Sequence, residues 1–174
     1  NGPDTFSPLS TVDRINFTND SVTASPRGKL SLARDGLAAT GNSNFGWFGG
    51  GEQSSIVSTV DRINFSNDSV TASPRGPLRA VRYMPTATGN SNYGWFAGGF
   101  AAVSIVDRID FSNDSVAASQ RGSFLARHAL AATGNSNYGW FGGGAPAIST
   151  VDRIDFANDT GTASVRGPLS LARV

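Results

Sequence analysis

The feature that most constrains this chain is an internal repeat that runs through its whole length. The sequence Val-Asp-Arg-Ile occurs four times, beginning at Val12, Val60, Val106 and Val151, at steps of 48, 46 and 45 residues. A Gly-Trp-Phe motif occurs three times, with its tryptophan at Trp47, Trp95 and Trp140. A period of about 20 to 50 residues is typical of proteins in which each unit buries its apolar face against the next unit.

Each unit predicts four short β-strands separated by turns. β-Branched and aromatic residues favour strands, whereas Asn, Asp and Gly favour tight turns, here at Asn42 to Asn44 and at Asn19-Asp20. No segment has the sustained 3.6-residue apolar period of a helix. The predicted strands are residues 37–40, 45–48 and 11–17, and a fourth that begins over residues 22–25 and ends near Arg27. The sequence therefore predicts an all-β fold, a β-propeller of four-stranded antiparallel blades.

The repeat divides the chain into one partial blade and three complete blades. The expected boundaries are 1–36 for the partial blade and 37–84, 85–130 and 131–174 for the complete blades. Closed propellers have about four to eight blades. About three and a half blades therefore predict a single repeat domain that belongs to a longer propeller or to an oligomer whose chains pool their blades.

The order of these strands resembles the kelch repeat. Residues 47–50 (Trp-Phe-Gly-Gly) stand where that repeat has an aromatic strand ending in a Gly pair, residues 12–17 stand at its third strand, and Arg34 stands at its closing basic residue. The kelch tryptophan of the fourth strand is missing near Ser25, and the tryptophan lies on the second strand instead. The resemblance covers nearly the whole chain and implies a kelch-like or galactose-oxidase-like propeller.

Two recurring phrases resemble a second group of proteins. Gly-Asn-Ser-Asn-Tyr-Gly-Trp-Phe-Gly-Gly-Gly and Ser-Thr-Val-Asp-Arg-Ile-Asp-Phe-x-Asn-Asp are similar to repeats in predicted structural proteins of marine bacteriophages, particularly cyanophages. This resemblance implies a structural viral protein, located in the virion or in another extracellular assembly.

The charged residues follow the repeat. Of 14 basic residues, 12 are arginines at three positions that recur four times, and only Lys29 and Arg79 stand outside them. A group that recurs in every blade serves the blade more often than it serves catalysis, so we expect the Val-Asp-Arg charges to bond backbone groups or a neighbouring blade. We expect the tryptophans in the core, with stacking of sugars or bases as the alternative. The residues given these structural roles are Asp13, Arg14, Asp61, Arg62, Asp107, Arg108, Asp152, Arg153, Trp47, Trp95 and Trp140.

Catalytic chemistry has little support in the sequence. The chain has no Cys, and its one histidine, His128, replaces Asp35 and Tyr83 at the same unit position. Galactose-oxidase-type enzymes, which the fold resembles, hold copper with Cys, Tyr and His, a set this chain does not contain. We therefore expect no enzymatic activity and no catalytic, cofactor or metal site. A net charge of +1 and the lack of an apolar run of about 20 residues argue against nucleic acid and membrane as partners.

The positions where the units differ are the candidates for partner contact. They lie in the loop after each Gly run and in the segment that precedes the next unit, at Glu52, Gln53, Phe100, Arg79 and His128. Variable loops on a regular scaffold suit recognition. We expect a non-enzymatic structural or adhesive module that contacts other protein subunits, further blades of the same polypeptide or glycans. A carbohydrate-binding propeller is the main alternative, followed by an intracellular kelch adaptor and by a hydrolase or oxidase.

Overall fold

The computed structural model describes residues 7–100 and 103–174. Among these residues the regular structure is four antiparallel β-sheets and two three-residue 3₁₀ helices, Phe65–Asn67 and Phe156–Asn158. The predicted all-β fold is confirmed. No helix in this part of the chain is long and apolar enough to cross a membrane.

One sheet has two strands and the other three have four each, joined in sequence order. The two-stranded sheet contains β1 (Asp13–Arg14) and β2 (Ser25–Pro26). The second contains β3 (Ala38–Gly41), β4 (Phe45–Gly49), β5 (Val60–Asn64) and β6 (Ser73–Arg75). The third contains β7 (Thr86–Gly89), β8 (Tyr93–Ala97), β9 (Ile105–Asp110) and β10 (Ser119–Ser123). The fourth contains β11 (Ala131–Gly134), β12 (Tyr138–Gly142), β13 (Val151–Asp155) and β14 (Ser164–Arg166).

The first two strands of each four-stranded sheet form a tight hairpin that the sequence encodes directly. The Asn42 side chain accepts hydrogen bonds from the backbone N–H groups of Asn44 and Phe45, at 2.9 and 3.0 Å. Asn90 and Asn135 do the same in the next two units. This side-chain turn holds the register in which Trp47 lies opposite Thr40 on one strand and opposite Arg62 on the other.

Two predicted strands differ from the structure. The strand expected over residues 11–17 is reduced to the two residues of β1. The equivalent strand of the next unit, β5, is longer because it pairs with both β4 and β6, whereas β1 pairs only with β2. The fourth strand starts three residues later than expected, at Ser25 or Ser73. The valines that suggested an earlier start, Val22 and Val70, are more than half exposed and lie in a turn.

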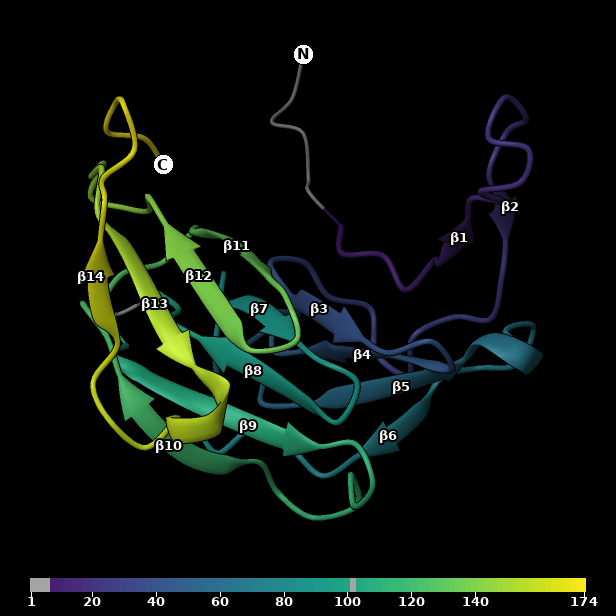
Figure 1. The fold of residues 1–174 in the computed structure, drawn as a ribbon. Helices are drawn as coiled ribbons and strands as arrows, with labels where there is room; N and C mark the ends of the chain where they lie inside the picture. Colours follow the sequence, from purple (N-terminus) through teal and green to yellow (C-terminus); the bar gives the residue numbers. More distant parts are fainter. Residues whose placement is uncertain (1–6, 101–102) are drawn as a thin grey trace.

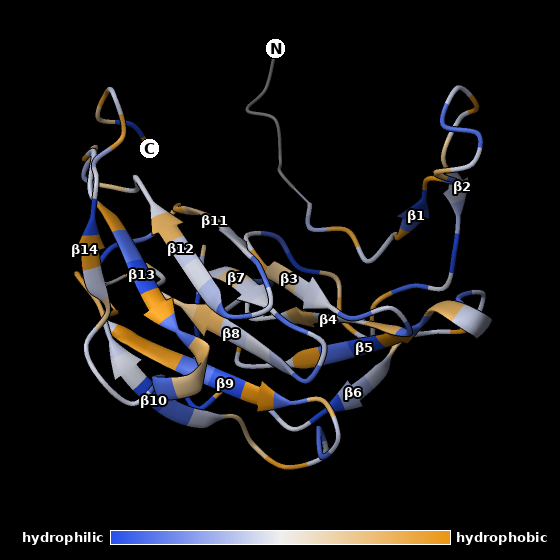
Figure 2. Cartoon of the chain, viewed as in Figure 1, coloured by the Kyte–Doolittle hydropathy of each residue, from blue (hydrophilic) through white to orange (hydrophobic). Residues whose placement is uncertain are grey.

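The sheets stand face to face in an open arc, with β1–β2 at one end and β11–β14 at the other (Figure 1). The first strands of the three large sheets lie side by side, since β7 contacts both β3 and β11. Hydrophobic and hydrophilic segments alternate along β5, β9 and β13 (Figure 2). The core is consequently divided into layers, each between two successive sheets, such as the layer of Trp95, Val106, Phe141 and Ile154.

Candidate interaction surface

Three contacts join the four sheets, and we call them joints. The first joint connects β1–β2 to β3–β6, the second connects β3–β6 to β7–β10, and the third connects β7–β10 to β11–β14. All nine ion pairs among the described residues lie at these joints, three at each. The repeated charges therefore connect one unit to the next.

One aspartate of each joint comes from the Asn-Asp turn of the later unit. In the third joint, Asp159 accepts hydrogen bonds from Trp95 Nε1 at 2.8 Å and Arg108 Nη1 at 3.0 Å, and Arg121 Nε lies 3.6 Å away. In the second joint, Asp114 contacts Trp47, Arg62 and Arg75 with nearly the same distances. This carboxylate is a polar contact shared by three side chains of the preceding sheet.

The same turn supplies an aromatic ring to the joint. Phe156 stacks on Trp95 with ring centroids 3.8 Å apart and planes 6° apart, and Phe111 stacks on Trp47 in the same way. Both tryptophans are fully buried. Their faces are occupied by these phenylalanines, so Trp47 and Trp95 do not present a surface on which a sugar or base could stack.

A second aspartate of each joint is the one in the Val-Asp-Arg motif. Asp107 pairs with Arg82 at 2.9 Å, and both side chains are completely buried. The guanidinium of Arg82 also donates to the carbonyl of Gly98, and Asp107 accepts from the backbone N–H of Arg79. The equivalent pairs are Arg34 with Asp61 and Arg127 with Asp152.

The predicted structural set omits nine of the fifteen side chains that form these ion pairs. It contains the Val-Asp-Arg charges and lacks the other nine partners: Arg27, Arg75, Arg121, Arg34, Arg82, Arg127, Asp68, Asp114 and Asp159. Repetition is the signal that identifies them, because each of the nine recurs once per unit at an equivalent position.

Five side chains that differ between units gather at one end of the sheets, in a group that we call the variable cluster: Asp35, Glu52, Tyr83, Phe100 and His128. Asp35 and Glu52 exchange backbone hydrogen bonds of 3.0 Å, and the Tyr83 hydroxyl lies 3.5 Å from Asp35 Oδ2. The Phe100 ring lies edge-on to Tyr83 and to His128, with centroids 6.4 and 5.3 Å apart. A continuous row of two acids and three aromatic rings results.

Three of the predicted contact residues, Glu52, Phe100 and His128, belong to the variable cluster. Gln53 is exposed next to Glu52, whereas Arg79 is exposed outside the cluster, beside the second joint. The predicted contact set omits Asp35 and Tyr83, although they hold the same unit position as His128.

The acids of the variable cluster affect its tyrosine. Partial burial and the negative charges of Asp35 and Glu52 raise the pKa of Tyr83 above its usual value of 10.0. The phenol therefore stays protonated at physiological pH and can donate a hydrogen bond. Within residues 7–100 and 103–174, no group of three or more His, Cys, Asp or Glu side chains is placed to hold a metal ion.

No protein-family model matches this chain, and no curated protein matches it.

Proposed function

We propose that this chain is a non-enzymatic structural and adhesive repeat module, built as a segment of a kelch-like β-propeller. Support comes from three sheets with the same strand order, whose first strands β3, β7 and β11 lie side by side. In propellers the sheets are arranged radially around a central axis, and the face-to-face succession of sheets in the open arc of Figure 1 supports this proposal.

The adhesive role is supported by one observation: the repeated charged side chains and the variable side chains lie in different parts of the scaffold. Fifteen of the repeated arginines and aspartates are engaged in joints, whereas five residues that change from unit to unit form the variable cluster at one end of the scaffold. A rigid framework with variable side chains at one end suits recognition of a partner. We propose that the variable cluster mediates attachment to a protein or cell surface, in a phage virion or another extracellular fibre.

Location is tested by immunogold electron microscopy of particles from the source, with an antibody raised against this chain. Gold on particle surfaces or fibres is the expected result. Label confined to soluble, dispersed protein would contradict the structural role.

Attachment is tested by competition, with the purified chain added while such particles bind their host cells. The chain should block attachment, and the variant Tyr83→Ala/Phe100→Ala should be at least about tenfold less potent, because aromatic anchors dominate most interfaces. Arg79→Ala is the matched control, since Arg79 is exposed but lies outside the variable cluster. Equal potency of all three proteins would argue against this surface.

A carbohydrate-binding role is the second candidate, favoured by aromatic rings flanked by the carboxylates of Asp35 and Glu52. Aromatic faces bind the apolar side of a sugar, and carboxylates accept its hydroxyl hydrogen bonds. A glycan array with the same variant and control decides between the two roles. Selective binding that Tyr83→Ala/Phe100→Ala abolishes would support the glycan role, and an array with no signal would remove it.

A further inference from the structure

The charged residues at the two ends of the arc correspond to the two aspartates and three arginines that form each joint, but here they have no partner sheet in the described part of the chain. Each of the three joints uses two aspartates and three arginines. The aspartates at the corresponding positions of the first unit, Asp13 and Asp20, are exposed and take part in none of these pairs. The arginines at the corresponding positions of the last unit are likewise outside them: Arg153, Arg166 and Arg173.

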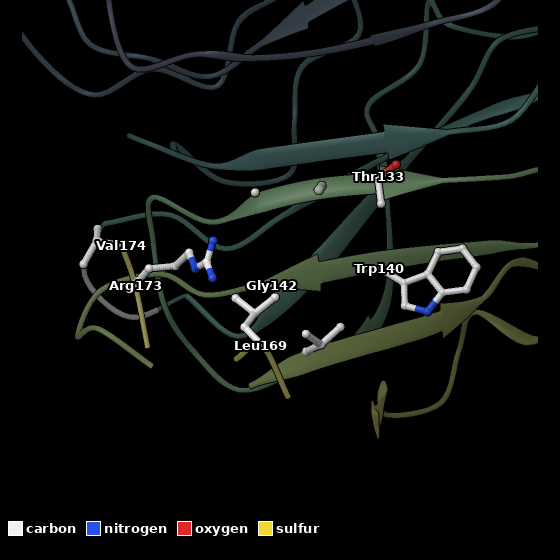
Figure 3. Close-up of a pocket in the computed structure, with 9 residues that line it drawn as sticks. Thr133, Trp140, Gly142, Leu169, Arg173 and Val174 are labelled. Atoms are coloured by element: carbon white, nitrogen blue, oxygen red, sulfur yellow. The ribbon is translucent and has the colours of Figure 1, made fainter. Parts of the chain in front are cut away.

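The outer face of β11–β14 has the apolar side chains of a joint, but no neighbouring sheet of the described residues packs on them. Trp140, Val151 and Leu169 correspond to Trp95, Val106 and Phe124 of the third joint, which are all buried. In the last sheet the three are only partly buried and line an open hollow of about 300 Å³, together with Arg173 (Figure 3). We call this face, with Arg153 and Arg166, the socket.

The first unit has the opposite set, in and just after β1, where Asp13, Ile15 and Phe17 line an open hollow beside the first joint. Ile15 and Phe17 are 55% and 92% exposed, whereas their counterparts in the last unit, Ile154 and Phe156, are 4% and 8% exposed within the third joint. We call Asp13, Ile15, Phe17 and Asp20 the plug. Its two acids and two apolar side chains complement the three arginines and the apolar hollow of the socket.

A glycine at the edge of the socket gives independent support. In the third joint the Gly122 N–H donates to the Asp159 carbonyl at 2.7 Å, and a side chain on Gly122 would overlap the Gly161 carbonyl. Gly76 has the same relation to the second joint. Gly167 holds this position in the last unit, yet nothing lies within 4 Å of where its side chain would be. The socket therefore has both the side chains and the backbone space that a neighbouring turn requires.

We propose that a second copy of this chain docks its plug into this socket, head to tail. Phe17 of the second copy stacks on Trp140, and its Asp20 accepts a hydrogen bond from Trp140 Nε1 and pairs with Arg153 and Arg166. Its Asp13 pairs with Arg173, and the Gly167 N–H donates to its Asp20 carbonyl. Since plug and socket lie on different faces, the contact is heterologous and repeats into a ring or a filament. This inference rests on the assembly part of the proposed function, and attachment through the variable cluster does not depend on it.

The test is sedimentation velocity of the purified 174-residue chain over a wide range of concentrations. The wild-type chain should form dimers and larger species as concentration rises, and less so as salt screens the ion pairs. Asp20→Lys in the plug and Arg166→Glu in the socket should each weaken association by at least about thirtyfold. Both residues are exposed, so circular dichroism and thermal unfolding should be unchanged. Arg79→Glu is the control for charge reversal outside both surfaces and should associate like the wild type.

Mixing the two variants makes the test specific to the head-to-tail geometry. The Asp20→Lys chain keeps its socket and the Arg166→Glu chain keeps its plug, so the equimolar mixture should form a dimer and nothing larger. A wild-type chain that stays monomeric would overturn the proposal and leave the socket to another occupant, such as a further unit of the same polypeptide. Association that survives in both variants, or a mixture that stays monomeric, would also overturn it. None of these three outcomes would change the result of the competition assay that tests attachment through the variable cluster.

Discussion

The first and third joints have the same ion pairs but differ in burial. In the third joint Phe156 is stacked on Trp95 and is 8% exposed, and the Asp159 side chain is 6% exposed. In the first joint Asp68 pairs with Arg14 and Arg27, yet Phe65 is 47% exposed and the Asp68 side chain 14% exposed. No tryptophan in the described part of the chain covers Phe65. The comparison indicates that the arginines set the position of the turn, whereas the aromatic stack excludes the water that would otherwise weaken their ion pairs.

The largest loss of stability is expected when the buried arginine–aspartate pair of a joint is broken, and this pair is equally buried in the first and second joints. Arg82→Ala leaves Asp107 buried and unpaired and should lower the free energy of unfolding by about 3–5 kcal/mol. Arg34→Ala should cost about as much in the first joint, because the Arg34 and Asp61 side chains are equally buried. Urea denaturation followed by far-ultraviolet circular dichroism measures both, with Arg79→Ala as the near-neutral control. A loss below about 1 kcal/mol for Arg34→Ala would show that the first joint is not formed in solution.

The shared turn aspartate should separate the two joints more clearly. Asp159→Ala removes the acceptor of Trp95 Nε1 and the partner of two arginines, and should cost about 2–4 kcal/mol because these groups are largely buried. Asp68→Ala removes only the two arginine contacts, one of them to a half-exposed side chain, and should cost about 1 kcal/mol. The same denaturation experiment compares them. Equal losses would refute the idea that the aromatic stack strengthens the ion pairs.

A smaller difference is expected for the arginines of the Val-Asp-Arg motif. The Arg108 guanidinium lies 4.3 Å from the centre of the Tyr93 ring and pairs with Asp159. Arg108→Ala should therefore cost about 1–2 kcal/mol, through lost packing as well as lost charge. Arg14 is about half exposed, so Arg14→Ala should cost less than about 1 kcal/mol. Thermal unfolding of the two variants tests the order, and an unchanged midpoint for Arg108→Ala would argue against a structural role for this arginine.

The sequence predicts the hairpins of this fold well and the joints only in part. The hairpin around Asn42 depends on neighbours in the chain, so its turn chemistry is visible in the residues themselves. The joints depend on contacts between residues 25 to 67 apart, from Arg82 with Asp107 to Trp47 with Asp114. Repetition shows that Asp114 matters, but local patterns do not show which side chain it meets. The variable cluster is similar, since Asp35 and Tyr83 become neighbours only when their sheets stack.

The smallest expected effect concerns the residue that precedes the turn of each joint. Asp110 accepts hydrogen bonds from the Ser112 hydroxyl at 2.7 Å and the Ser112 N–H at 2.9 Å, and these bonds lower the pKa of Asp110 below its usual 3.8. Because the folded pKa is lower than the unfolded one, this carboxylate stabilises the fold above pH 3.8 and loses that contribution as pH falls through its folded pKa. Asn64 accepts the same two bonds from Ser66 without a charge. Asp110→Asn should therefore keep the turn, cost at most a few tenths of a kcal/mol at neutral pH after solvent screening, and flatten the acid side of the stability profile. Urea denaturation of both proteins between neutral and acid pH tests this, and a loss above about 1 kcal/mol at neutral pH would mean that the Asp110 charge itself holds the second joint together.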